Sequence, residues 1–136
     1  MIVGTGVDIE EVARIEEAVT RHGRRFLDRV FTAREIAYVE GTSQPYQRYA
    51  ARFAAKEAGM KALGTGWDRG VRWLDLEVVN DGSGRPSLTL HGRAAAIAGE
   101  MGCTAVHLSL SHTRHHAVAQ VIFEKQEAGE LIRGIH

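Results

Sequence analysis

Alternation of apolar and polar positions predicts that the chain opens with a β-strand over residues 2–9. Residues 3, 5, 7 and 9 share one face and the intervening residues share the other. The second face carries Gly4 and Gly6. Glycine weakens the interior of a strand, so it is usually found there where another backbone or a ligand comes close. We therefore expect a close approach to this face.

The apolar spacing then changes to that of helices. Phe31 to Ile36 has the features of a helix start: Thr32 can cap, Glu35 completes a capping box, and Phe31 and Ile36 can form a hydrophobic staple. Glycines mark the ends of these segments. The pattern predicts helices over 10–30, with a candidate break at Gly23, over 32–40, ended by Gly41, and over 46–63, ended by Gly64-Thr65-Gly66.

The second half of the chain is mostly strand. In 71–80, Leu74, Leu76 and Val78 are expected to face the core and to alternate with Trp73, Asp75 and Glu77. The turn residues of 80–84 predict a hairpin with 86–91. An Ala-rich helix over 93–101 and strands over 104–111 and 117–124 follow. We predict one α+β domain over residues 1–125, with a mostly antiparallel sheet of about five strands packed with helices, and a tail over 126–136.

Length and composition agree with that class. A chain of 136 residues with 44% hydrophobic residues suits one domain with a real core. The single cysteine, Cys103, excludes an internal disulfide and a multi-cysteine metal site, and it fits a reducing cytosol. The sequence has neither an apolar run of about 20 residues nor the layout of a signal peptide. We expect a cytoplasmic protein with no membrane partner.

The net charge of zero, from 17 basic and 17 acidic residues, argues against a nucleic-acid partner. This neutrality hides two opposite segments. Residues 8–17 carry five carboxylates against Arg14, a balance of −4, and residues 21–34 carry five arginines against Asp28, a balance of +4. Attraction to a helix dipole explains one or two of these arginines, not five. The basic segment suits an acidic partner.

Two segments could form a phosphate-handling site. Asp8 ends the glycine strand, where it could also simply cap the next helix. Glu57 and Lys61 share one helix face, where the ordinary interpretation is a surface ion pair. That face also carries the apolar Phe53 and Met60, which favours the wall of a site. The following Gly64-Thr65-Gly66 offers backbone N–H groups for phosphate, although glycine is also the usual helix stop.

A third candidate is the segment Ser109-Leu110-Ser111-His112-Thr113. It lacks the surroundings of a nucleophilic serine, and a hairpin tip with His112, His115 and His116 is a poor zinc site. These polar residues could simply be solvated, or they could bind phosphate. Two carboxylates with a lysine and a glycine turn suit Mg²⁺ and a phosphorylated substrate. Because the sequence has no Walker motif, an NTPase is disfavoured.

Taken together, the motifs resemble the small phosphopantetheinyl transferases of the holo-[acyl-carrier-protein] synthase family. The resemblance covers about residues 3–123, with the motifs in the family's order. The early Gly-Val-Asp and the later Lys-Glu-Ala-x-x-Lys make a specific pair. The matching stretches are Gly4-Thr5-Gly6-Val7-Asp8-Ile9, Phe31-Thr32-Ala33-Arg34-Glu35, Arg52-Phe53-Ala54-Ala55-Lys56-Glu57-Ala58, Lys61-Ala62-Leu63-Gly64-Thr65-Gly66, Gly84-Arg85-Pro86 and Leu108-Ser109-Leu110-Ser111-His112.

The resemblance implies transfer of 4′-phosphopantetheine from coenzyme A to a serine of apo acyl carrier protein, with release of adenosine 3′,5′-bisphosphate. Asp8 and Glu57 would hold Mg²⁺, or Mn²⁺ in its place, and Lys61 would contact the pyrophosphate beside Gly64. Glu57 would also help to deprotonate the serine.

The resemblance also implies how the substrates and subunits are arranged. Arg85 and Pro86 would line the adenine end of coenzyme A, and Ser111 and His112 the 3′-phosphate region. In a homotrimer with active sites between subunits, Arg85 and His112 would come from the neighbouring subunit. Acyl carrier proteins are acidic, and in the family the carrier docks at the start of the helix predicted over 10–30. The candidate docking residues are Arg14, Arg21, Arg24 and Arg25.

Two other functions compete with the transferase. One is an inert module that binds coenzyme A or a carrier protein. The other is a Mg²⁺-dependent phosphohydrolase that acts on a different pyrophosphate. Both carboxylates and Lys61 are present, which favours catalysis over the inert module, and the arginine-rich segment favours a protein acceptor over water.

Overall fold

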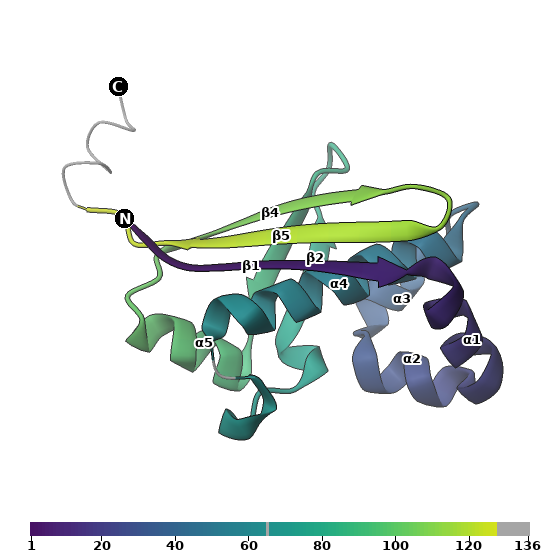
Figure 1. Cartoon of the computed structure of the whole chain (residues 1–136), viewed down its shortest axis with the longest axis horizontal. Helices are drawn as coiled ribbons and strands as arrows, with labels where there is room; N and C mark the ends of the chain where they lie inside the picture. The colour runs from purple at the N-terminus through teal and green to yellow at the C-terminus, as the bar shows by residue number, and fades with distance from the viewer. Residues whose placement is uncertain (65, 128–136) are drawn as a thin grey trace.

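The computed structural model describes residues 1–64 and 66–127. Within these ranges, five helices and five strands, with two short 3₁₀ turns (η1 and η2), confirm the α+β class, and Figure 1 shows their arrangement. In chain order the elements are β1 (Ile2–Glu11), α1 (Val12–His22), α2 (Arg24–Val30), α3 (Ala33–Glu40), α4 (Pro45–Leu63), η1 (Gly66–Arg69), η2 (Trp73–Asp75), β2 (Leu76–Asn80), β3 (Pro86–Leu90), α5 (Gly92–Glu100), β4 (Ala105–His112) and β5 (His116–Glu124).

The five strands form two antiparallel sheets, where the sequence predicted a single sheet. One sheet has the order β1-β5-β4, and the other is the β2–β3 hairpin, which pairs Asn80 with Pro86 as expected. Figure 1 shows α4 running beneath the three-stranded sheet. No helix in the described part of the chain is long and apolar enough to cross a membrane.

The glycine face of β1 lies against α4. A Cβ atom on Gly6 would stand 1.9 Å from the carbonyl oxygen of Ala58, and one on Gly4 would stand 2.4 Å from that of Ala62. Both distances are shorter than any real contact of a Cβ atom, so only glycine allows this approach. The close approach expected at this face is therefore that of another backbone. It places Asp8, two residues after Gly6, beside the second half of α4.

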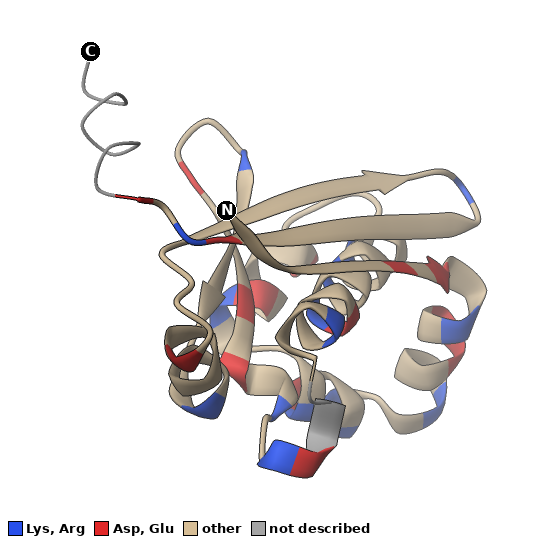
Figure 2. Cartoon of the chain, turned by 60° about the vertical axis from the view of Figure 1, so that its left-hand side comes forward, with Lys and Arg blue, Asp and Glu red and all other residues tan. Residues whose placement is uncertain are grey.

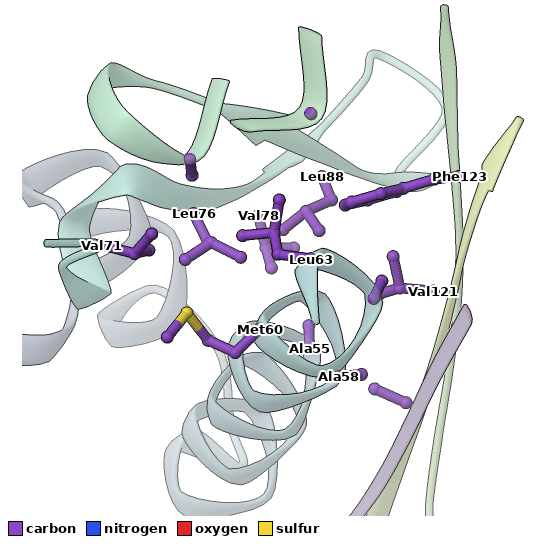
Figure 3. Close-up of a cluster of buried hydrophobic side chains, with 14 of the residues drawn as sticks. Ala55, Ala58, Met60, Leu63, Val71, Leu76, Val78, Leu88, Val121 and Phe123 are labelled. Carbon is purple, nitrogen blue, oxygen red and sulfur yellow. The ribbon is translucent and has the colours of Figure 1, made fainter. Parts of the chain in front are cut away.

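The larger hydrophobic core fills the space around α4. Figure 3 shows Leu76, Val78 and Leu88 of the hairpin directed toward α4 from one side. Val121 and Phe123 of β5 approach from the sheet. A second cluster joins α1, α2, α3 and the first half of α4 around the buried Phe31 and Tyr49.

A buried ion pair ties the hairpin to α4. Oε1 of Glu35 accepts hydrogen bonds from Nζ of Lys56 at 2.8 Å and from N of Thr32 at 2.9 Å, and its Oε2 accepts one from N of Val78 at 3.0 Å. Lys56 also donates to the carbonyl oxygens of Trp73 and Leu76. Both charged side chains are fully buried. The capping box predicted at Thr32 is confirmed. Its glutamate, Glu35, also pairs with Lys56.

Two predicted elements were wrong in their boundaries. The helix predicted over 10–30 is two helices, because β1 continues to Glu11 and Gly23, at φ +57°, separates α1 from α2. The strand predicted over 71–80 begins only at Leu76, after η2. Its expected alternation also fails, since Asp75 and Glu77 are buried. They can be buried because they accept hydrogen bonds from Arg72 and Thr32, respectively.

Candidate active site

Asp8 and Lys61 meet where β1 crosses α4. Nζ of Lys61 lies 3.2 Å from Oδ1 of Asp8 and donates to the carbonyl oxygen of Val7 at 2.9 Å. The Asp8 side chain is 13% exposed and that of Lys61 is 55% exposed. Asp8 does not cap a helix, because it lies within β1 and α1 begins only at Val12. The capping interpretation is therefore wrong.

Glu57 joins this pair from the preceding turn of α4. Burial raises the pKa of its carboxyl group, the negative charge of Asp8 raises it further, and the charge of Lys61 opposes the rise. In the described residues Lys61 is paired with Asp8, and no ion pair joins it to Glu57. The simple surface ion pair expected from the helix spacing is therefore not formed. The structure brings together Asp8, Glu57 and Lys61 from segments about fifty residues apart.

Glu10 is a third carboxylate at this site, and the sequence analysis missed it. Burial, a hydrogen bond to Asp8 and the charges of Asp8 and Glu57 raise its pKa to about 8, while Arg14 opposes the rise. Glu10 was placed at the start of a helix. Had β1 been extended by two residues, the alternation would have put Glu10 on the face of Asp8.

We expect the stability of the metal-free protein to depend on Glu10 at alkaline pH. Because the folded pKa of about 8 lies above the ordinary 4.5, the folded state holds this proton longer than the unfolded state. The free energy of unfolding should therefore fall as pH rises from 4.5 to about 8. Glu10→Gln should remove much of that fall and be more stable than wild type by about 1–2 kcal/mol at alkaline pH, after solvent screening is allowed for.

Urea unfolding in EDTA at a series of pH values measures this difference. The two proteins should be nearly equal in stability at acidic pH and diverge above neutrality. Glu11→Gln, which changes an exposed neighbour on the opposite strand face, is the control. An equal gain from both variants, or a constant difference at every pH, would contradict the proposed environment of Glu10.

The carboxylate cluster fits a divalent cation. Oδ2 of Asp8 is buried and accepts no hydrogen bond from any described residue. Burial raises the pKa values of Glu10 and Glu57, and the charge of the neighbouring Asp8 raises both further, so three carboxyl groups lie close together here. No group of three His, Cys, Asp or Glu residues has the arrangement of a complete metal site in the described ranges. The site therefore suits Mg²⁺ held by one or two carboxylates, with substrate phosphates as further ligands.

Gly64, in the glycine turn after Lys61, caps the C-terminus of α4. Gly64, at φ +75°, donates its N–H to the carbonyl oxygens of Met60 and Lys61. This group is therefore occupied by the helix cap. Thr65 lies outside the described residues, and Gly66 begins η1.

Arg85 and Pro86 lie in a different region from the carboxylates. They line a cleft of about 370 Å³ together with other residues of the β2–β3 hairpin and of β4: Asp81, Ser87, Val106, His107, Leu108 and Ser109. β5 separates β4 from β1, so this cleft and Asp8 belong to opposite edges of the sheet. Ser111 and His112 are exposed at the far end of β4 and do not line the cleft.

The basic segment begins in the last turn of α1, continues through α2 and ends in the first turn of α3. The rest of α1 also exposes the acidic Glu16 and Glu17, and Figure 2 shows residues of both charges on that helix. Arg14, Arg21, Arg24 and Arg25 are all exposed, although Arg21 pairs with Glu17 and Arg24 with Asp28. A shallow groove of about 260 Å³ lies on this surface, lined by His22, Arg25, Phe26 and Arg29.

The known proteins that this chain resembles belong to a single family. The sequence model of the 4′-phosphopantetheinyl transferase superfamily matches residues 4–122. A holo-[acyl-carrier-protein] synthase of Solibacter usitatus (strain Ellin6076) is 55% identical over 124 residues, which make up 91% of this chain and 99% of that protein.

Two solved structures extend the similarity to the fold. Holo-[acyl-carrier-protein] synthase from Neisseria meningitidis superposes with a TM-score of 0.83 at 33% identity, covering 92% of this chain and 100% of that one. A holo-(acyl-carrier-protein) synthase from Bacillus anthracis str. Ames, solved in complex with CoA (3′,5′-ADP), has a TM-score of 0.76 at 41% identity, covering 93% of this chain and 99% of that one.

Proposed function

Because the chain belongs to the 4′-phosphopantetheinyl transferase superfamily, we propose that it transfers 4′-phosphopantetheine from coenzyme A to a serine of apo acyl carrier protein. Adenosine 3′,5′-bisphosphate is the second product. The observation that carries this proposal is the convergence of Asp8, Glu57 and Lys61 at the crossing of β1 and α4. That convergence also favours the transferase over an inert binding module.

Asp8 and Glu57 would hold Mg²⁺, or Mn²⁺ in its place. When bound, the ion would neutralise charge on the pyrophosphate of coenzyme A. Lys61 supports the same task from the protein, because its ammonium group is half exposed beside Asp8 and can turn toward a bound phosphate. In the absence of phosphate, its bonds to Asp8 and Val7 keep it at the site.

Glu57 is the group best suited to take the proton of the incoming serine. A general base works best when its pKa lies close to the working pH. Burial and the charge of Asp8 shift the pKa of Glu57 upward, in that direction. Its carboxylate is half-buried on the α4 face that carries Phe53 one turn earlier, so it lies at the edge of a surface that a protein acceptor can reach.

A homotrimer would complete the coenzyme A site. The outer face of the three-stranded sheet exposes apolar side chains, with Val7 58%, Ile9 65% and Val118 37% exposed, which suits burial against another subunit. Within one chain, the cleft at Arg85 and Pro86 lies across the sheet from Asp8. This separation supports a site in which the neighbour's Arg85 contacts the adenine end of coenzyme A and the neighbour's His112 contacts the 3′-phosphate region. Native mass spectrometry should give the mass of three chains, and a monomer at micromolar concentration would contradict this arrangement.

The carrier protein is the acidic partner of the basic surface. Arg14, Arg21, Arg24 and Arg25 would attract its carboxylates and speed the encounter. Arg14 is close enough to Glu10 to affect its pKa, so the basic surface reaches the edge of the carboxylate cluster. This continuity favours a protein acceptor over water, and hence the transferase over a phosphohydrolase.

The test of this function is direct. The protein is mixed with coenzyme A, Mg²⁺ and an apo acyl carrier protein that a known transferase modifies, and the carrier is weighed by mass spectrometry. A gain of one phosphopantetheine group is expected, together with adenosine 3′,5′-bisphosphate in solution. An unmodified carrier would contradict the proposal. Hydrolysis of the pyrophosphate bond of coenzyme A without modification of the carrier would indicate the phosphohydrolase.

A further inference from the structure

A larger groove lies between α2 and the segment that contains η2. Its volume is about 610 Å³, and its lining residues are Arg29, Val71, Arg72, Trp73 and Leu74. Three of these five side chains are apolar, and the two others are arginines. The groove is therefore an apolar floor with guanidinium groups beside it, and neither the carboxylate cluster nor the Arg85 cleft includes any of its residues.

A shared residue and a ring contact connect this groove with the shallow groove of α2 and with helix α4. Arg29 also lines the shallow groove with Arg25 and Phe26, so the two grooves meet at one side chain. On the other side, the ring of Trp73 packs on that of Phe53, with centroids 4.9 Å apart and planes at 30°. Phe53 is one helical turn before Glu57 on α4. The large groove thus adjoins the shallow groove at Arg29, and its Trp73 packs on the residue one turn before Glu57.

The charge of the groove is positive. Arg29 is exposed, and none of the described residues forms an ion pair or hydrogen bond with it. The Arg72 side chain is 73% exposed and is oriented by Asp75, which lies 3.3 Å away and is only 4% exposed. A ligand would therefore meet two guanidinium groups while the balancing carboxylate stays covered.

We propose that this groove binds an apolar side chain of the acidic carrier protein, with Arg29 and Arg72 pairing with the carboxylates around it. An amphipathic helix binds a groove of this kind by its apolar face, and flanking cations select a helix rich in acidic residues. The inference rests on the proposed function and enlarges the docking surface beyond α1 and α2. It adds Arg29, Arg72 and Leu74 to the residues that determine which carrier protein binds.

Arg72→Glu and Leu74→Ala test the two halves of this proposal. Steady-state rates are measured with apo carrier and coenzyme A varied in turn. Arg72→Glu should raise the KM for carrier about tenfold at low salt, and much less at 0.5 M salt, because an exposed charge acts through a screened attraction. Leu74→Ala should weaken carrier binding about three- to tenfold at either salt concentration, because it removes apolar contact. The KM for coenzyme A should stay within about twofold in both variants.

Lys125→Glu is the matched control. It makes the same change of charge at an exposed residue that follows β5, and it should leave the KM for carrier nearly unchanged. An effect of Arg72→Glu no larger than that of Lys125→Glu would overturn the proposal, and so would a rise in the KM for coenzyme A instead. If wild type modifies no carrier at all, the proposed function itself has failed. To keep that case distinct, direct binding of apo carrier to each variant is measured by calorimetry.

Discussion

Replacing Glu57 with glutamine is expected to lower kcat/KM for carrier modification by at least about a thousandfold, since it removes both a base and a cation ligand. The same change should raise the melting temperature of the metal-free protein. Burial and the charge of Asp8 disfavour the ionised form of Glu57 in the folded state, so a neutral side chain of the same shape relieves repulsion. Loss of activity with a gain in stability is the signature of a group strained for function.

Three measurements separate this result from simple misfolding. Mass spectrometry follows the carrier, thermal unfolding in EDTA reports stability, and calorimetry with Mn²⁺ reports cation affinity, which should fall. Glu100→Gln changes an exposed glutamate of α5 that pairs with Arg69. It should change neither the rate of carrier modification nor the cation affinity, and it should not raise the melting temperature. Wild-type rates in Glu57→Gln would remove Glu57 from the mechanism.

Local signals in the sequence predicted most of the fold. The capping box at Thr32 and Glu35 and the turn before Pro86 were predicted correctly because neighbouring residues determine them. The end of β1 was missed, because Val12 and Ile15 fit a helical spacing and the helix was predicted to begin at Glu10 instead of Val12. The division into two sheets also escaped prediction, because strand pairing depends on contacts between distant segments.

In the candidate site, too, the sequence predicted what neighbouring residues determine and missed what depends on contacts between distant segments. Periodicity placed Glu57 and Lys61 on one helix face but suggested that they pair with each other, whereas Lys61 is paired with Asp8. Only the approach of β1 to α4 at Gly6 brings Asp8 there. Lys56, next to Glu57 in sequence, was given no role, because nothing local shows that a lysine will be fully buried. Its partner Glu35 is 21 residues away.

That buried pair leads to the largest expected effect on stability. Lys56→Met keeps most of the length of the side chain and leaves the charge of Glu35 buried without its cation. Breaking a buried ion pair from one side costs about 3–5 kcal/mol, which is a large part of the stability of a small domain. The loss should also loosen the β2–β3 hairpin, since Lys56 holds the carbonyl oxygens of Trp73 and Leu76. Urea unfolding gives the free energy, and hydrogen exchange at Leu76 and Val78 reports the hairpin.

The matched control is Lys61→Met on the same helix. Lys61 is 55% exposed, so its pair with Asp8 should contribute less than about 1 kcal/mol to stability. The double variant Lys56→Met/Glu35→Gln should recover part of the loss, because it removes the unpaired charge while the amide oxygen of the new side chain can still accept a hydrogen bond from Thr32 or Val78. Equal losses in Lys56→Met and Lys61→Met would show that burial of the pair does not determine its effect. A double variant no more stable than Lys56→Met would show that the unpaired carboxylate is not the source of the loss.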